Sequence, residues 1–238
     1  MSQNYRAILV GTGSVADAHV RAIEETHGRV RLVSAVDTDA ERVKAFCQRH
    51  QVPAARTDYR VALREDAPDL VLIAAPPAVH TVMSIAAMEA GAWVFCEKPL
   101  CASLAEFDRI AEAEQRTGRY TACVFQQRFG SSTAHLRRLA AEGLLGRPLV
   151  AVCHTLWFRD AGYYAVPWRG KWTTELGGPT LHTSTTPVPR IDIRAGLAVG
   201  QIHPALQHPV NIPAHAFDSF RTHQSPDNQA TLPQYSGL

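Results

Sequence analysis

Short apolar runs alternate with amphipathic segments along the first half of the chain. The run at residues 6–10 ends at a glycine, and apolar residues then recur at helical spacing over 16–25. The same alternation predicts further strands over 31–36, 69–75, 93–96 and 120–125 and further helices over 40–50, 59–64, 79–90 and 104–116. We expect the run at 120–125 to be the sixth strand of its sheet. Such alternation is typical of an α/β fold of the Rossmann type, a parallel sheet with helices on both faces.

The pattern changes after residue 129. A helix is predicted over 132–142 and a strand of a different sheet over 149–158. Aromatic residues follow, and they either form a second core or line a sugar pocket: Trp157, Tyr163, Tyr164, Trp168 and Trp172. We therefore predict a dinucleotide-binding Rossmann domain over 1–129 and an incomplete α+β domain over 130–181, for substrate or for oligomerisation.

The last part of the chain has a different composition. No lysine or glutamate occurs beyond Glu175, while proline and histidine recur. Proline interrupts both helices and strands, so we expect residues 182–238 to be a largely irregular tail.

Composition and charge exclude several classes of protein. Of the 238 residues, 46% are hydrophobic and 19% charged, which is enough apolar material for a buried core. The net charge of +2 is scattered, so we expect no nucleic-acid partner. No apolar run is long enough to span a bilayer, and no signal peptide is recognised at the start. The five cysteines include no Cys-x-x-Cys pair and predict free thiols, a cytoplasmic protein and no metal site.

A glycine-rich turn follows the first predicted strand. Its residues are Gly11, Thr12, Gly13, Ser14, Val15 and Ala16. Gly11 permits a tight turn, Gly13 lets a pyrophosphate approach the backbone, and Ala16 allows close helix packing. The N–H groups at the helix start, with Ser14 as the expected cap, favour such an anion. The turn predicts a dinucleotide site, although small residues also occur in ordinary strand-to-helix turns.

An acidic residue stands where the second strand ends. Asp37 lies 21 residues beyond Ala16, near the spacing of about 20 for a carboxylate that binds the adenosine ribose. This carboxylate repels a 2′-phosphate and no arginine follows it directly, so NAD(H) is favoured over NADP(H). Two alternatives to a dinucleotide site are open at this point. In the first, the turn is an ordinary strand-to-helix turn and Asp37 is a solvated residue at the end of a strand. In the second, the turn binds a methyl donor such as S-adenosylmethionine. The six-strand pattern and the next motif argue against the methyl donor.

The tripeptide Glu97-Lys98-Pro99 follows another predicted strand. Ligands of open α/β sheets bind at the carboxyl ends of the strands, which places Lys98 at the ligand edge. Its ammonium group can donate to a hydroxyl or carbonyl and assist proton movement. The tripeptide alone is equally compatible with a surface ion pair at a turn.

Together these motifs resemble the Gfo/Idh/MocA family of nicotinamide-dependent oxidoreductases. The resemblance extends over about residues 5–181 and also uses the segments 75–80 and 126–129. It implies NAD(H) or NADP(H) across the sheet edge and Lys98 as the catalytic residue. The residues implied at the cofactor are Gly11, Thr12, Gly13, Ser14, Val15, Asp37, Ala75, Pro76, Pro77, His80, Glu97, Lys98, Pro99, Gln126 and Arg128. His80 is equally compatible with a hydrogen-bonded histidine at a helix start. Trp168 and Arg169 are candidate substrate contacts.

The resemblance ends near residue 181. The family continues beyond a Gly-Gly turn into a helix with an acid and, one turn later, a histidine. Here Gly177 and Gly178 match the turn, but Pro187 and Pro189 occupy the helix positions. We hypothesise that the C-terminus is replaced, by a frame-shifted reading or by truncation.

Three functions are compatible with these patterns. The first is an NAD(P)-dependent oxidoreductase that acts on a secondary alcohol or ketone of a sugar, cyclitol or similar polyol. The second is a nucleotide-binding protein without turnover, either a catalytically impaired remnant or a redox sensor. The third is a structural partner that associates with an intact relative, and a homo-oligomer is also compatible.

Overall fold

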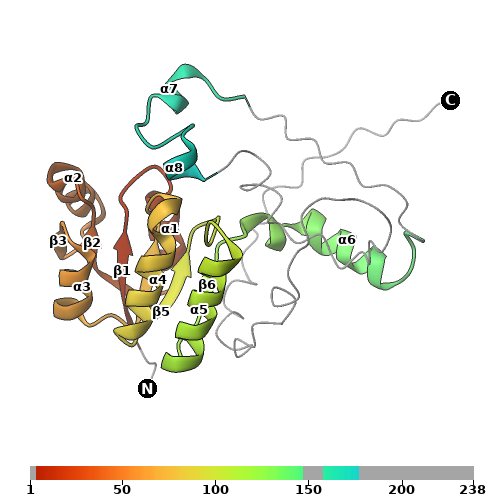
Figure 1. Ribbon diagram of the computed structural model, residues 1–238, viewed down its shortest axis with the longest axis horizontal. Helices are drawn as coiled ribbons and strands as arrows, with labels where there is room; N and C mark the ends of the chain where they lie inside the picture. Colours follow the sequence, from red (N-terminus) through yellow and green to blue (C-terminus); the bar gives the residue numbers. More distant parts are fainter. Residues whose placement is uncertain (1–3, 147–157, 177–238) are drawn as a thin grey trace. The chain divides into compact units, whose positions relative to one another are not determined.

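The computed structural model describes residues 4–146 and 158–176, and within them the chain forms a six-stranded parallel sheet (Figure 1). Its strands are β1 (Tyr5–Val10), β2 (Val30–Val36), β3 (Ala54–Arg56), β4 (Leu70–Ile73), β5 (Trp93–Cys96) and β6 (Thr121–Cys123). They lie in the order β3-β2-β1-β4-β5-β6, so the direction of winding reverses between β1 and β4. This is the strand order of a Rossmann fold, and the prediction of an α/β Rossmann-type sheet is confirmed.

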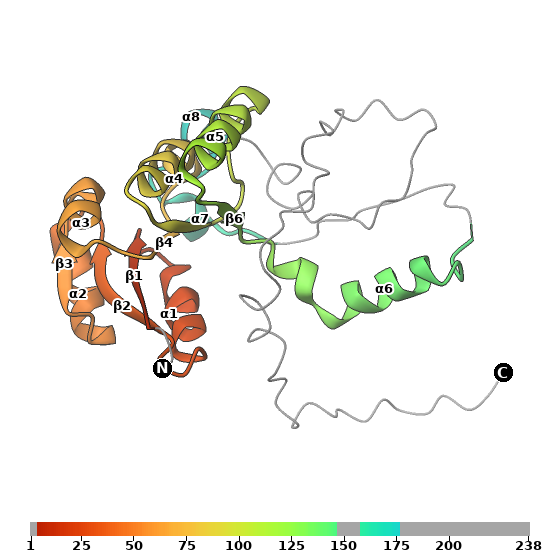
Figure 2. The ribbon, with the colours of Figure 1, turned by 90° about the horizontal axis from the view of Figure 1, so that it is seen from below.

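Helices cover both faces of the sheet (Figure 2). Helices α1 (Ala16–Glu24) and α2 (Ala40–His50) lie on one face, while α3 (Tyr59–Asp66), α4 (His80–Glu89) and α5 (Leu104–Thr117) lie on the other. Side chains of a strand point alternately to its two faces. On β1, Ala7 and Leu9 accordingly pack toward α1 and α2, whereas Ile8 and Val10 pack toward α3, α4 and α5.

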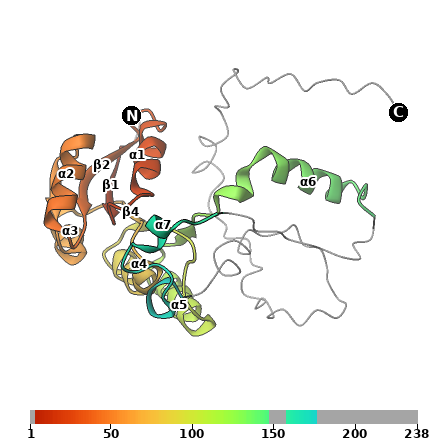
Figure 3. The same ribbon diagram turned by 90° about the horizontal axis from the view of Figure 1, so that it is seen from above.

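The central strands are buried on both faces, which explains their continuous apolar sequence. In β4, Val71, Leu72 and Ile73 are each at most 4% exposed. Strands covered by helices on both sides need such runs, because no face is left for polar residues. Helices α4 and α5 pack side by side over one of these faces (Figure 3).

Most predicted elements are present with bounds shifted by at most two residues, but one strand was missed. Strand β3 has only three residues, Ala54–Arg56, and pairs with the end of β2. It was missed because neither alternation nor an apolar run marks so short an edge strand. The 3₁₀ helix η1 (Pro77–Val79) precedes α4, where the sequence predicted one continuous helix from residue 79.

Shorter elements follow the sheet. They are the 3₁₀ helix η2 (Gln126–Phe129), α6 (Ser131–Ala141), α7 (Ala161–Tyr164) and α8 (Trp172–Glu175). The predicted helix over 132–142 is therefore confirmed, while most of the strand expected over 149–158 and all of the tail lie outside the described residues. The three-part domain division stays a prediction. No helix in the described ranges has the length and apolar character that crossing a bilayer requires.

Candidate functional site

The glycine-rich turn fits tightly against the loop that follows β4. Gly11 has a φ of +99°, and its N–H donates to the Val36 carbonyl at 2.8 Å. A Cβ atom at this position would lie 2.5 Å from the Ala74 carbonyl oxygen and 2.7 Å from the Ala75 nitrogen. Only glycine combines this backbone angle with this close approach, so Gly11 fixes the turn relative to β4.

The other side of the turn is open. A Cβ atom built on Gly13 meets no atom within 4 Å, and Gly13, Ser14 and Val15 are exposed. The expectation that Ser14 caps α1 is wrong, because the helix begins after Val15 and no side chain caps it. No side chain covers this end of α1, although the Ala16 and Ala18 N–H groups donate to the Gly13 and Val15 carbonyls, and the exposed backbone at Gly13 gives a pyrophosphate room to approach the positive end of the helix. These residues fit the phosphates of a dinucleotide.

Asp37 and Thr12 join the ends of β2 and β1. The Thr12 N–H and hydroxyl both donate to Oδ2 of Asp37, at 3.0 and 2.8 Å. The Asp39 N–H donates to Oδ1 at 3.1 Å. Burial alone would raise the pKa of Asp37, but the hydrogen bonds from Thr12 and Asp39, with the nearby Arg42, outweigh it and hold the pKa below its usual value. Asp37 is therefore an oriented carboxylate at neutral pH.

Arg42 is a charged neighbour of Asp37 that sequence reasoning missed. It comes from the first turn of α2, and its guanidinium lies 3.5 Å from Asp37 and 3.1 Å from Asp39. The residues that directly follow Asp37 in sequence, Thr38 and Asp39, include no arginine, but the first turn of α2 brings Arg42 back to the end of the strand. The Arg42 side chain is 55% exposed and engaged with two carboxylates.

The Glu97-Lys98-Pro99 element extends the sheet edge beyond β5. The Glu97 N–H donates to the Ile73 carbonyl at 2.8 Å, which continues the ladder between β4 and β5. Glu97 and Pro99 are buried and Lys98 is half-buried, and the peptide bond between Lys98 and Pro99 is cis. The strand end thus holds the backbone of Glu97 in place, and Lys98 follows it directly.

Two buried histidines contact this element. On α1, Nε2 of His19 lies 3.2 Å from Oε1 of Glu97, close enough for an ion pair but without the alignment of a hydrogen bond. On α4, Nδ1 of His80 lies 2.7 Å from the Pro99 carbonyl oxygen, and Nε2 lies 2.8 Å from the Ala75 carbonyl oxygen. Since α1 and α4 cover opposite faces of the sheet, the two imidazoles support the element from both sides.

The remaining predicted cofactor residues lie on the loops after β4 and β6. Ala75 and Pro76 are half-buried and Pro77 is buried at the start of η1. In η2, Gln126 is exposed and Arg128 is half-buried. Burial, together with Arg137, lowers the pKa of Arg128. All of these loops follow the carboxyl ends of parallel strands, so they belong to the same edge of the sheet as the glycine-rich turn.

Trp168 and Arg169 form a cluster with their neighbours in sequence. The Arg169 guanidinium lies 4.0 Å from the ring centre of Tyr163 and 4.4 Å from that of Trp168. It also lies 3.5 Å from Glu175 and donates to the Tyr163 hydroxyl. Stacking on two rings and pairing with a carboxylate satisfy this cation within its own segment.

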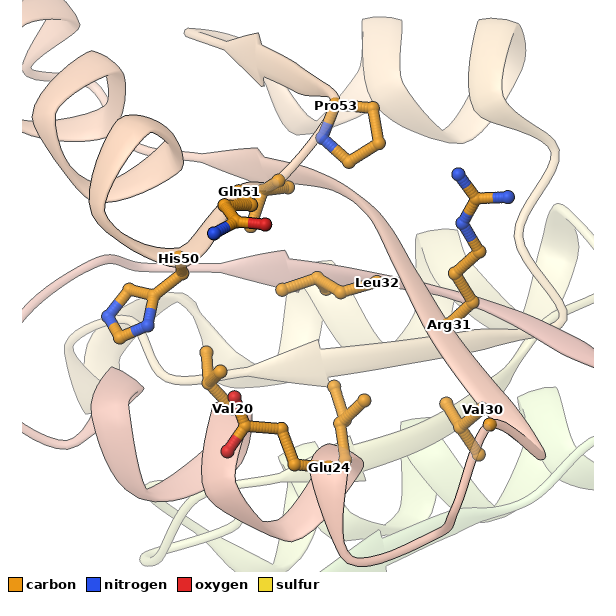
Figure 4. A pocket seen from close by; sticks show the side chains of 11 residues that line it. Val20, Glu24, Val30, Arg31, Leu32, His50, Gln51 and Pro53 are labelled. Carbon is orange, nitrogen blue, oxygen red and sulfur yellow. The ribbon is translucent and has the colours of Figure 1, made fainter.

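A hollow of about 290 Å³ lies away from these residues (Figure 4). It is formed by the C-terminal ends of α1 and α2 and by the start of β2, with Val20, Val30 and Leu32 among its apolar residues and Glu24, Arg31 and His50 among its polar ones. It includes none of the predicted site residues. Asp37 follows the opposite end of β2, so the hollow is not the dinucleotide site.

Comparison with known proteins connects this geometry to a family. The model of an oxidoreductase family with an NAD-binding Rossmann fold matches residues 5–125. An inositol 2-dehydrogenase of Salmonella paratyphi B is 30% identical over 147 residues, which are 61% of this chain and 44% of the relative. The chain thus spans less than half the length of this curated relative.

Solved structures show the same fold. The WlbA dehydrogenase of Chromobacterium violaceum, in complex with NADH and UDP-GlcNAcA, has a TM-score of 0.69 and 26% identity over 77% of this chain and 53% of its own. The myo-inositol 2-dehydrogenase of Lactobacillus plantarum has a TM-score of 0.57 and 28% identity over 61% of this chain and 43% of its own. Both similarities place this chain's sheet among those of dehydrogenases.

Gly11→Ala should destabilise the fold by at least ~3 kcal/mol, because the new Cβ would collide with the backbone of Ala74 and Ala75. Gly28→Ala is the matched control, since Gly28 also has a positive φ, +83°, but open space around its Cβ. The control should lose only about 1–2 kcal/mol from backbone strain. Urea unfolding followed by circular dichroism measures both losses, and equal losses would contradict the collision.

Thr12→Val should reduce the stability of the fold by an amount that depends on pH. Because the pKa of Asp37 is lowered in the folded protein, its carboxylate contributes stability that is complete above about pH 4 and is lost as the pH falls through the folded pKa. The variant removes one donor to Asp37, so it should lose about 1 kcal/mol at pH 7, and this loss should shrink as the pH falls and Asp37 becomes protonated.

The control for this prediction is Thr117→Val, which removes a hydroxyl that donates to the Ala113 carbonyl. Its loss of stability should not depend on pH between 7 and 3, because a carbonyl does not titrate. Urea unfolding across this range separates the two variants. A pH-independent loss in Thr12→Val would show that the hydroxyl does not act through Asp37.

Proposed function

Because the chain belongs to the oxidoreductase family with the NAD-binding Rossmann fold, we propose that it transfers hydride between NAD(H) and a secondary alcohol or ketone of a sugar, cyclitol or similar polyol. The relatives support this substrate class, since they include dehydrogenases named for inositol and one bound to UDP-GlcNAcA. The chain covers about half or less of the length of these relatives, so the activity of the complete protein is part of the proposal.

One observation carries the proposal. The Thr12–Asp37 hydrogen bonds place an ionised carboxylate beside the glycine-rich turn, and the open backbone at Gly13 lies in the same turn. A dinucleotide needs these two features together, one for its pyrophosphate and one for its adenosine ribose. Lys98 follows β5 at the same edge of the sheet.

We assign the cofactor to residues at this edge. Backbone N–H groups of the turn and of α1 would bind the pyrophosphate, and Asp37 would accept hydrogen bonds from the ribose hydroxyls. The Asp37 carboxylate would repel a 2′-phosphate, and the nearby Arg42 is already paired with Asp37 and Asp39. This arrangement favours NAD(H) over NADP(H).

The reaction needs a group that moves a proton while the carbon changes oxidation state. When bound, the nicotinamide supplies the hydride acceptor or donor. Lys98 would donate a hydrogen bond to the substrate oxygen and take up its proton when the alcohol is oxidised, or return the proton when the ketone is reduced. The backbone on both sides of Lys98 is anchored, by the Glu97 ladder bond and by the His80–Pro99 contact, which fixes the point from which its side chain extends.

Trp168 and Arg169 are proposed as substrate contacts. Their aromatic and cationic groups suit a sugar ring and its hydroxyls or an acidic substituent. The pairing of Arg169 with Glu175 leaves the cluster close to neutral, which suits a polyol better than a dianion.

A redox sensor that acts through cysteine is disfavoured by the thiols of the described residues. Burial raises the pKa of Cys96, Cys101 and Cys123. The reactive form of a cysteine is the thiolate, and sensor cysteines are accessible thiols with lowered pKa values. These three groups stay protonated at neutral pH and therefore fit packing better than sensing.

Fluorescence titration of the 238-residue chain with NADH and NADPH, followed by absorbance assays with a polyol panel, tests the proposal. We expect tighter binding of NADH, and turnover that falls at least ~100-fold in Lys98→Ala because the proton-transferring group is lost. Lys44→Ala, on the exposed side of α2, is the control and should retain turnover. Binding without any turnover would identify a nucleotide-binding remnant, and absence of binding would reject both functions.

Asp37→Ser should reduce the preference for NADH over NADPH about tenfold or more. The variant removes the charge that repels a 2′-phosphate and leaves Arg42 paired with Asp39 alone. Asp39→Ser is the matched control, because a serine can still cap α2 and Asp37 remains in place. Dissociation constants for both cofactors give the ratio. An unchanged ratio in Asp37→Ser would place the ribose elsewhere.

A further inference from the structure

His80 lies where two loops of the site meet. It is the first residue of α4 and is fully buried, at 0% exposed. Its Nε2 faces the Ala75 carbonyl oxygen at 2.8 Å, on the loop after β4. Its Nδ1 faces the Pro99 carbonyl oxygen at 2.7 Å, on the loop after β5. One side chain therefore bridges two loops that are 24 residues apart in sequence.

The chemistry of these contacts is specific for an imidazole. A carbonyl oxygen only accepts hydrogen bonds, so each ring nitrogen needs a proton to bind its partner. A neutral ring donates to one carbonyl, and only the imidazolium donates to both. Burial lowers the pKa of His80 more than the two carbonyls and Glu97 raise it, and Lys98 lowers it further. Both ring nitrogens lie within hydrogen-bonding distance of a carbonyl oxygen, so the ring holds one carbonyl by donation when it is neutral and both when it is protonated.

The two loops both carry site residues. Pro99 directly follows Lys98, so a fixed Pro99 carbonyl restricts where the lysine backbone lies. Ala75 is one of the two residues against which Gly11 packs, with its nitrogen 2.7 Å from the position of a Gly11 Cβ. A continuous series of contacts thus runs from the glycine-rich turn through Ala75 and His80 to Pro99.

We propose that His80 is a positioning residue, which fixes Lys98 relative to the dinucleotide turn by bridging the Ala75 and Pro99 carbonyls. It reaches the substrate only through Lys98, and this inference rests on the function proposed above for that lysine. A histidine that merely filled the core would leave Lys98 unaffected when an apolar residue of similar size replaced it.

The lysine content of the chain makes a direct test possible. The sequence contains only three lysines, Lys44, Lys98 and Lys171. Reductive methylation with ¹³C-formaldehyde labels each amine, and the dimethyl-lysine signals can be assigned by Lys→Arg variants of the full chain. The position and width of the Lys98 signal then report its surroundings, while Lys44 and Lys171 serve as internal references.

His80→Leu should move the Lys98 signal and leave the other two unchanged, and NADH affinity should fall about tenfold. His80→Gln retains N–H donors and should return the Lys98 signal toward its native position. Met88→Ala is the control for core damage, because Met88 is buried on the same helix but is not bonded to either loop. It should lose stability without moving the Lys98 signal.

An unchanged Lys98 signal in folded His80→Leu would overturn the inference, as would an equal change in Met88→Ala. If His80→Leu does not fold, His80→Asn takes its place, since its shorter amide cannot reach both carbonyls and the same shift is required. Failure of the proposed function is recognised separately, by the absence of NADH binding to the unmodified chain.

Discussion

The close approach of Gly11 to the backbone of Ala74 and Ala75 is the constraint on which the site depends. It holds the end of β1 against the end of β4, where the winding of the sheet reverses. Thr12 then reaches Asp37 at the end of β2, and Ala75 reaches His80. The hydrogen bonds of the site therefore extend in both directions from a contact that contains no side chain.

Parallel strands explain why distant residues meet here. The turn at 11–16, Asp37, the loop at 74–77 and Glu97-Lys98-Pro99 each follow a strand at its carboxyl end. The apolar core between the layers keeps these ends in register but contributes no chemistry. Buried polar contacts then determine the finer geometry, with His19 and Glu97 on one face and His80 on the other.

The sequence predicted the sheet and the location of the site because both follow from local patterns. Apolar runs located five of the six strands, and the spacing of Asp37 from Ala16 placed it beside the turn. Contacts made across space could not be predicted in this way. Arg42 was missed because a helical turn separates it from Asp37, and β3 because three edge residues give no pattern.

The two contacts of His80 could not be predicted from the sequence either. Its two partners are carbonyl groups, which every residue carries, so no residue type at 75 or 99 indicates them. For Ser14 the residue type was misleading. Serine is a common helix cap and stands near the start of α1, but no side chain caps this helix.

The hydrogen bonds from Thr12 to Asp37 have a consequence for the energetics of ligand entry. They keep this carboxylate ionised and aligned in the free protein. An arriving ribose would meet a group that is already charged, so docking at this point would be proton-neutral around pH 7. Its enthalpy would then be insensitive to the ionisation heat of the buffer.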